Sequence, residues 1–219
     1  MKSLIKLDEL TFHYHSYLVK DNDDCFYFYD DYLPSVYDNP TNSLIANYKK
    51  KINVQPYLMR YKDEAIKKVA NMIRYNFENV VNNYTLIPIP PSKQSDHEEY
   101  DDRNTKTLKL AFGNKQNIEI KEYIITSLSH DSFHNSSTNR KSPDELYEHL
   151  DVDEREKPTN KDIILFDDLL TTGCHFKACQ KLILEKIPEA KVRGLFIARR
   201  KINEAVDDFF DFDDFFSEL

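Results

Sequence analysis

Residues 163–175 read Ile-Ile-Leu-Phe-Asp-Asp-Leu-Leu-Thr-Thr-Gly-Cys-His. The four apolar residues predict a buried strand that leads directly into Asp167 and Asp168. A turn that contains Gly173 follows, and then a predicted helix that ends near residue 186. Backbone N–H groups and the positive end of a helix dipole hold phosphates at such a helix start. The stretch therefore predicts a sugar-phosphate site whose two carboxylates accept hydrogen bonds from sugar hydroxyls.

Helical and strand patterns alternate over most of the chain. The predicted elements are helices near 63–82, 108–111, 143–150 and 173–186, and strands at 84–90, 118–125, 163–166 and 192–198. This alternation predicts an α/β fold with a parallel sheet flanked by helices. Ligands of such sheets bind beyond the carboxyl ends of the strands, where residues 90–92 and 167–175 fall.

The N-terminal part has a different pattern. Aromatic, β-prone runs at 10–19 and 25–29 are separated by the turn-forming residues 21–24, which predicts a hairpin and hence a small β-rich hood. Pro34 and Pro40 predict a loop after it. We therefore divide the chain into an N-terminal hood at 1–60, a core at 61–205 and an acidic, aromatic tail at 206–219.

Composition excludes several function classes. The chain has 219 residues and a net charge of −8, which argues against a general nucleic-acid-binding surface because such a surface is basic. No apolar run approaches the roughly 20 residues of a membrane span, and no N-terminal signal peptide is recognisable. The three cysteines form no CxxC pair, so we expect neither a disulfide framework nor a zinc ribbon. We expect a cytoplasmic protein with no membrane partner.

Residues 163–175 resemble the ribose-phosphate signature of the type I phosphoribosyltransferases: four apolar residues, two acids, two apolar residues, then Thr-Thr-Gly-x-Thr. Every position matches except the last, where this chain has His175. Residues 86–92 resemble the strand and pyrophosphate loop of the ComF-like branch, and residues 100–104 resemble its mobile loop. The resemblance covers residues 63–200. The N-terminal zinc-binding cysteine cluster of many ComF-like proteins is missing here.

This resemblance implies a type I phosphoribosyltransferase-like fold and an enzyme that binds phosphoribosyl pyrophosphate with Mg²⁺. Such an enzyme transfers the phosphoribosyl group to a base or another acceptor and releases pyrophosphate. The resemblance implies catalytic roles for Asp167 and Asp168 at the ribose, with Mg²⁺ contacted only through the Mg²⁺–ligand complex, and for Arg103 on a loop that could close over the pyrophosphate. It implies that the substrate is bound by Leu170, Thr171, Thr172, Gly173, Cys174, His175, Ser92 and Lys93.

Two departures from the family pattern keep a second function open. Thr171 stands where some purine-using members have an Asp that exchanges a proton with the base, so the turn has no evident general base. His175 replaces a hydroxyl that usually binds phosphate. The alternative is a non-catalytic sensor or partner-binding module that holds a phosphoribosyl ligand or a nucleotide in the same pocket.

Four histidines are spaced in pairs that could, in principle, ligate a metal ion. His13 and His15 fall at strand spacing on one face and could ligate a metal, but no third ligand is near them in the sequence. His130 and His134 are four residues apart, in a segment whose composition predicts a loop. We interpret all four as ordinary strand or loop residues.

Two further segments have open roles. Arg140 and Lys141 are candidate phosphate contacts, because relatives often present basic residues in this segment. The tail at 206–219 is dense in Phe and Asp, which predicts packing either against the chain itself or against a basic protein partner. A homodimer of the chain is also an open alternative for its partners.

Overall fold

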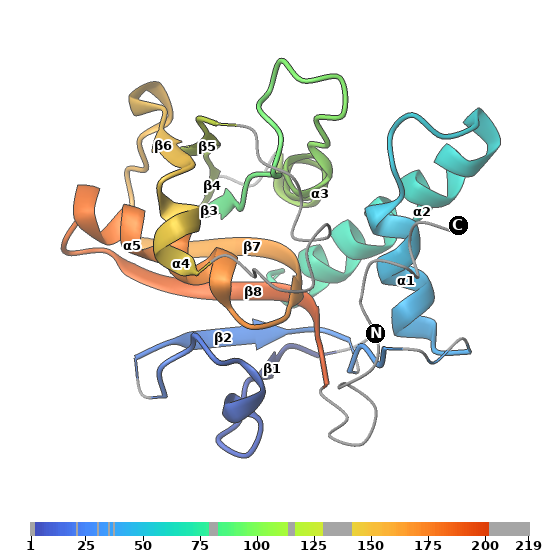
Figure 1. The fold of residues 1–219 in the computed structure, drawn as a ribbon, viewed down its shortest axis with the longest axis horizontal. Coiled ribbons are helices and arrows are strands. Elements are labelled where there is room, and N and C mark those ends of the chain that lie inside the picture. The colour runs from blue at the N-terminus through green and yellow to red at the C-terminus, as the bar shows by residue number, and fades with distance from the viewer. Residues whose placement is uncertain are drawn as a thin grey trace.

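The computed structural model describes residues 3–20, 22–29, 31–34, 36, 38–78, 83–113, 117–128 and 142–201. A central sheet contains strands β1 (Ile5–Lys6), β2 (Asp24–Tyr27), β3 (Tyr84–Pro88), β4 (Ile118–Ile120), β7 (Asp162–Leu170) and β8 (Lys191–Arg199). The strand order is β1-β2-β8-β7-β3-β4 (Figure 1). β1 runs antiparallel to β2, and every other neighbouring pair is parallel. The predicted α/β fold with a mostly parallel sheet is confirmed.

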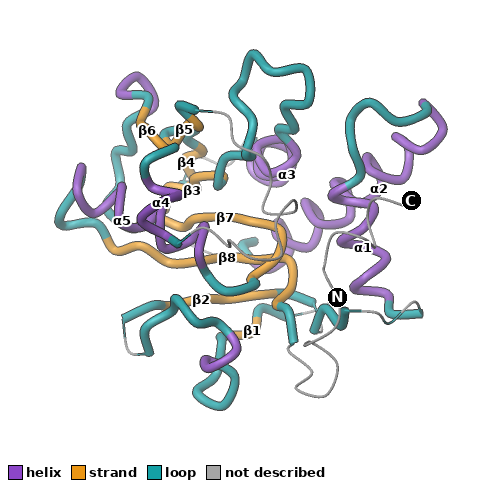
Figure 2. The backbone as a smooth tube through the Cα atoms, viewed as in Figure 1, coloured by secondary structure: helices purple, strands orange, loops and turns teal. Residues whose placement is uncertain are grey.

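Helices cover both faces of this sheet (Figures 1 and 2). Helices α1 (Pro40–Lys49), α2 (Pro56–Asn76) and α3 (Arg103–Phe112) share one apolar core with the sheet. Helix α5 (Cys174–Lys186) packs in a second core on the opposite face. The short helix α4 (Pro143–Tyr147) contacts α5 through Leu146. Two one-turn 3₁₀ helices, η1 (Phe12–Tyr14) and η2 (Glu154–Glu156), lie in connecting segments.

Strand β7 is central and covered on both sides, so its apolar residues are consecutive and do not alternate with polar ones. Ile163, Leu165 and Phe166 are fully buried. The strand extends past its predicted end to Leu170, with Asp167 paired to Phe196 of β8. The two acids therefore belong to the strand, and the alternation of side chains directs them to opposite faces.

The N-terminal hairpin prediction is wrong. Residues 10–19 form the turn η1 and bends, because the Asp8 carboxylate accepts hydrogen bonds from the N–H (3.0 Å) and hydroxyl (2.8 Å) of Thr11 and turns the chain there. Strand β2 pairs in parallel with β8. β2 also pairs antiparallel with β1, so this part of the chain widens the central sheet.

Helix α1 was not predicted, because Pro40 reads as a loop residue. In the structure Pro40 occupies the first helical position, where its missing N–H and fixed φ are suited to a helix start. The Asn39 side chain caps the helix by accepting from the N–H groups of Thr41 (2.7 Å) and Asn42 (3.2 Å). The pair Asn39-Pro40 therefore starts a helix and does not continue the loop.

The single strand predicted at 118–125 is divided in two. Its first part is β4 in the central sheet, and its second part is β5 (Ile124–Thr126), which pairs antiparallel with β6 (Leu150–Val152) in a separate two-stranded sheet. The predictions for His130, His134, Arg140, Lys141 and the tail at 206–219 lie outside the described residues. None of the described helices is both long and apolar enough to cross a membrane.

Candidate functional site

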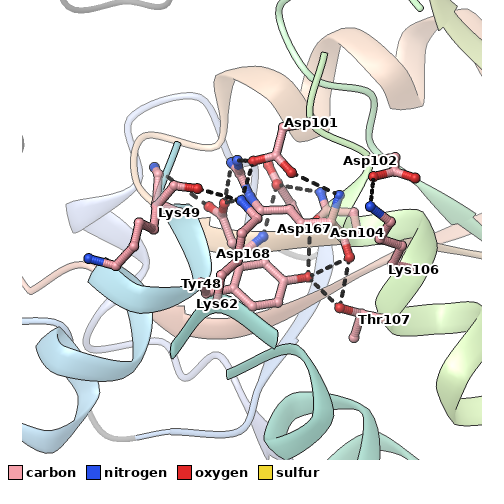
Figure 3. Close-up of polar contacts among 12 residues, drawn as sticks. Tyr48, Lys49, Lys62, Asp101, Asp102, Asn104, Lys106, Thr107, Asp167 and Asp168 are labelled. Carbon is pink, nitrogen blue, oxygen red and sulfur yellow. Dashed lines mark hydrogen bonds and ion pairs between the residues drawn. The ribbon is translucent and has the colours of Figure 1, made fainter. Parts of the chain in front are cut away.

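The candidate site lies where β3 and β7 end and α5 begins, as expected for a parallel sheet. Asp167 and Asp168 lie there because they are close to the C-terminal end of β7, which ends at Leu170. Asp168 lies beside Lys49 of α1, and Asp167 lies beside Asn104 in the first turn of α3 (Figure 3). Asp168 also contacts Arg103 of α3, and Asp167 also lies near His175 of α5. The two carboxylates therefore have different partners and are described separately.

Asp168 is held by two cations. Its Oδ2 accepts hydrogen bonds from Nε (3.1 Å) and Nη2 (2.8 Å) of Arg103, and its Oδ1 lies 3.8 Å from Nζ of Lys49. The residue is only 4% exposed, and burial by itself opposes ionisation. Lys49 and Arg103 outweigh this effect, so the pKa of Asp168 is below its ordinary value of 3.8. Asp168 is therefore a buried, ionised and fully engaged carboxylate.

A second acid extends this network toward α2. Asp101 accepts a hydrogen bond from Nη1 of Arg103 (2.6 Å) and another from Nζ of Lys62 (2.6 Å). Lys62 also donates to the carbonyl of Lys50 (2.5 Å). Burial lowers the pKa of Lys62 below its ordinary value, and Asp101 offsets part of that change. Arg103, which begins α3, is thus held on both sides in this structure.

Asp167 is oriented by an amide. Nδ2 of Asn104 donates to Oδ1 of Asp167 (3.1 Å) and to the carbonyl of Ile89 (3.2 Å), and so connects β7 to the residue that follows β3. The Oδ1 atom of Asn104 in turn accepts from the buried hydroxyl of Tyr48 (3.1 Å). The Oδ2 atom of Asp167 lies 3.7 Å from Nδ1 of His175. Oδ2 is therefore the carboxylate oxygen directed toward the start of α5, which follows the turn.

The carbonyl groups of residues 170–172, where β7 ends and the turn begins, are hydrogen-bonded to other segments of the chain. The carbonyl of Leu170 accepts from the N–H of Arg200 (2.8 Å), and those of Thr171 and Thr172 accept from the N-terminal segment. Within the described ranges, no hydrogen bond is found from the N–H groups of Thr171, Thr172 or Gly173. Three consecutive donors next to the start of a 13-residue helix form an anion-binding arrangement.

Gly173 has the backbone conformation that this turn requires. Its φ is 84°, a left-handed conformation that costs other residues about 1–2 kcal/mol. A Cβ atom there would lie 2.7 Å from Cδ2 of Leu18. The glycine therefore meets both a conformational and a steric demand.

We expect Gly173→Ala to lower the free energy of unfolding by about 2–4 kcal/mol, through backbone strain and overpacking. A double-mutant cycle with Leu18→Ala, measured by urea denaturation, separates the two causes. Because Leu18→Ala removes the clash, the double variant should lose less stability than the sum of the single losses. Additive losses would contradict the steric part of this account.

The structure places the other predicted site residues around the same turn. His175 and Ser92 line one small pocket, so the loop after β3 meets the first turn of α5. The remaining lining residues are Ile89, Pro90, Pro91, Thr126, Leu146, Leu150 and Cys179. Lys93 is part of the same loop as Ser92 and is partly buried. Burial raises the pKa of the Cys174 thiol to about 12, so only its backbone N–H suits an anionic ligand.

No protein-only metal centre is found in the part of the chain that the structure describes, where no three His, Cys, Asp or Glu side chains could hold an ion together. Asp168 faces cations on both oxygens, which leaves Oδ2 of Asp167 as the suitable carboxylate donor. Mg²⁺ keeps several waters and often binds one or two carboxylates together with substrate phosphates. The donor set thus fits a Mg²⁺ ion that arrives with a diphosphate.

Sequence reasoning missed several members of this site. Tyr48 and Lys49 were missed because α1 was not predicted, although the capping pattern Asn39-Pro40 would have indicated a helix start. Lys62 resembles any other lysine of an amphipathic helix, and no sequence signal marks its burial. Asp101 and Asn104 were within a recognised motif but were assigned no role.

Comparison with known proteins adds no family. No protein-family model matches the chain, and a search of curated proteins finds no match. The phosphoribosyltransferase resemblance, and its ComF-like branch, therefore stay predictions that rest on the residues quoted above.

Proposed function

We propose that this protein binds phosphoribosyl pyrophosphate with Mg²⁺ and transfers the phosphoribosyl group to an acceptor, releasing pyrophosphate. One observation carries the proposal: the N–H groups at residues 171–173, which make no hydrogen bond among the described residues, adjoin both the start of α5 and the oriented carboxylate of Asp167. Phosphate and vicinal hydroxyls require these two features side by side. The proposed acceptor is a nucleophile, either a base or another group.

The residues suggest how such a reaction would proceed. The turn would hold the 5′-phosphate, and Oδ2 of Asp167 would accept a hydrogen bond from a ribose hydroxyl. The bond from the anomeric carbon to the pyrophosphate oxygen would break as the bond to the acceptor forms. The carboxylate would favour the positive charge that develops on the sugar ring, while Arg103, Lys49, Ser92 and Lys93 would face the leaving pyrophosphate.

Calorimetry with phosphoribosyl pyrophosphate and Mg²⁺, run beside a pyrophosphate-release assay with a panel of bases, tests this function. We expect saturable binding of one equivalent, and release that depends on an added base. Absence of binding by the folded protein would overturn the proposal.

A sensor role is the second candidate. It is favoured by Thr171, which offers no proton-transferring acid, and by the engagement of both Asp168 oxygens with Arg103 and Lys49. A ligand that requires Asp168 must first displace these cations. Binding without pyrophosphate release, across the whole panel of bases, would select the sensor over the transferase.

Substitution of Lys49 tests whether the positive charge that α1 contributes to the site takes part in ligand binding. The Nζ atom of Lys49 lies 3.8 Å from Oδ1 of Asp168, beyond hydrogen-bond distance, so the ammonium can contact an anionic ligand as well. We expect Lys49→Met to weaken binding of phosphoribosyl pyrophosphate about tenfold. Lys161→Met is the matched control, because Lys161 precedes the opposite end of β7 and pairs with the exposed Glu189. Equal affinities for both variants would contradict a role for Lys49.

A further inference from the structure

The N-terminal segment packs against the outer side of the phosphate-binding turn. Nδ1 of His15 is hydrogen-bonded to the carbonyl of Thr171. The N–H of Tyr17 donates to the carbonyl of Thr172 (3.0 Å). Leu18 fills the space over Gly173, where a Cβ atom would lie 2.7 Å from its Cδ2. Three successive residues of the turn are thus contacted from one side by a segment about 155 residues away in sequence.

A buried carboxylate fixes this segment to α5. Asp23 accepts from Nζ of Lys177 at 3.0 Å on both of its oxygens, and from Nε2 of Gln180 at 3.0 Å. It also accepts from the N–H of Val19 (2.7 Å). Asp23 is 5% exposed, so removal of any partner leaves a buried charge unsatisfied. The segment and the first turns of α5 therefore form one unit around the turn.

His15 is the buried polar contact of this segment with the turn. It is 1% exposed, and a carbonyl oxygen can only accept, so Nδ1 carries the hydrogen. Nε2 is buried and has no hydrogen-bond partner among the described residues. A second proton on Nε2 would therefore be buried without an acceptor, which favours the neutral ring with its hydrogen on Nδ1.

The geometry of the peptide bond links these contacts to the ligand side. In a trans peptide the C=O and the following N–H point in opposite directions within one plane. A carbonyl of Thr171 held toward His15 therefore directs the N–H of Thr172 away from it. The carbonyl of Thr172, held by Tyr17, does the same for the N–H of Gly173.

We propose that His15 is a positioning residue, which holds the Thr171 carbonyl so that the N–H groups of the turn are presented to a ligand phosphate. The ligand part of this inference rests on the proposed function. The orientation of the turn does not, and can be measured without any ligand.

Three variants separate hydrogen bonding from packing. Asn places its amide nitrogen where His has Nδ1, whereas Gln places it nearer to Nε2 and Ala has none. We expect His15→Asn to bind phosphoribosyl pyrophosphate with Mg²⁺ within about twofold of the unmodified chain, and His15→Gln and His15→Ala to bind about five- to tenfold more weakly. Equal losses in all three variants would reduce His15 to a packing role and overturn the inference.

Hydrogen exchange of the unliganded protein keeps this test independent of the proposed function. Peptides that cover residues 168–176 should exchange faster in His15→Gln and His15→Ala, but not in His15→Asn. If the unmodified chain binds no phosphoribosyl pyrophosphate yet shows this exchange pattern, the proposed function fails and the role of His15 stands. If exchange is the same in every variant, the role of His15 fails, whatever binds.

An NMR measurement on the unmodified chain covers the case in which a variant does not fold. Long-range ¹H–¹⁵N correlation distinguishes the two neutral tautomers of His15. We expect the hydrogen on Nδ1. A hydrogen on Nε2 would overturn the inference, because Nδ1 could then not donate to Thr171.

The same contact predicts a pH dependence of stability. Burial lowers the pKa of His15 below its ordinary value of 6.5; the Thr171 carbonyl and Asp31 oppose this shift, and Arg199 and His13 add to it. The unfolded chain therefore binds a proton first, so the stabilisation is present above pH 6.5 and is lost as pH falls from 6.5 through the lower folded pKa. The melting temperature should fall less steeply over that range in His15→Asn, whose side chain does not titrate. Parallel curves for the two proteins would contradict this prediction.

Discussion

Replacing Asp168 with alanine should lower the free energy of unfolding by about 3–5 kcal/mol, the range for breaking a buried ion pair from one side. Asp168 accepts two hydrogen bonds from Arg103 and faces Lys49, and it is 4% exposed. Its loss leaves the guanidinium, which is 19% exposed, with Asp101 as its remaining acidic partner among the described residues. A carboxylate at the end of a strand would therefore contribute about as much to folding as a large core side chain.

Urea denaturation followed by circular dichroism measures this loss. Glu189→Ala is the matched control, since it also removes an acid from an ion pair, here with Lys161 at 3.0 Å, but at an exposed position. We expect the control to change stability far less than Asp168→Ala does, because an exposed ion pair is screened by water. Similar losses for both variants would show that Asp168 is no more engaged than a surface acid.

Replacing Asp167 with asparagine should weaken binding of phosphoribosyl pyrophosphate about 10- to 100-fold, the value of one or more hydrogen bonds to a charged group. Asparagine keeps an oxygen in place of Oδ1, which accepts from Asn104 (3.1 Å) and from the N–H of Asp168 (2.8 Å). Only the charge and the Oδ2 acceptor on the side of the turn are lost. We therefore expect binding to suffer while the melting temperature stays close to that of the unmodified chain.

Asp168→Ala should thus reduce stability, whereas Asp167→Asn should reduce ligand binding, although the two residues are adjacent. Asp162→Asn, at the other end of β7, is the control for Asp167→Asn, since its carboxylate pairs with the side chain of Arg193 (3.0 Å). Calorimetric titration of the three proteins gives the comparison. Unchanged affinity in Asp167→Asn, or an equal loss in Asp162→Asn, would remove Asp167 from the proposed site.

The core of the fold could be predicted because its elements have strong local signals. Residues 163–166 are apolar, β-prone and followed by a turn, and α5 and β8 follow with bounds close to those predicted. The N-terminal part could not be predicted in this way. Its aromatic runs satisfy strand propensity, but the position of β2 beside β8 depends on pairing across about 170 residues, which no local pattern specifies.

The residues of the candidate site also include some that the sequence predicts and some that it does not. The structure brings Arg103 and Asp168 together, but Arg103 is the first residue of α3 and is paired with Asp101 and Asp168, whereas the family resemblance implies a loop that closes over the pyrophosphate. Lys49 and His15 were not predicted as parts of the site. Each enters from a segment whose position depends on tertiary packing, α1 in one case and the turn before β2 in the other.

Amide chemical-shift mapping tests the central claim most directly. Ribose 5-phosphate and phosphoribosyl pyrophosphate with Mg²⁺ are added to ¹⁵N-labelled protein, with ribose alone as the control without phosphate. We predict the largest shifts at the amides of residues 171–175 with both phosphorylated ligands, and none there with ribose. Shifts concentrated elsewhere, or no shift in the turn at saturating ligand, would contradict a phosphoribosyl site at the end of β7.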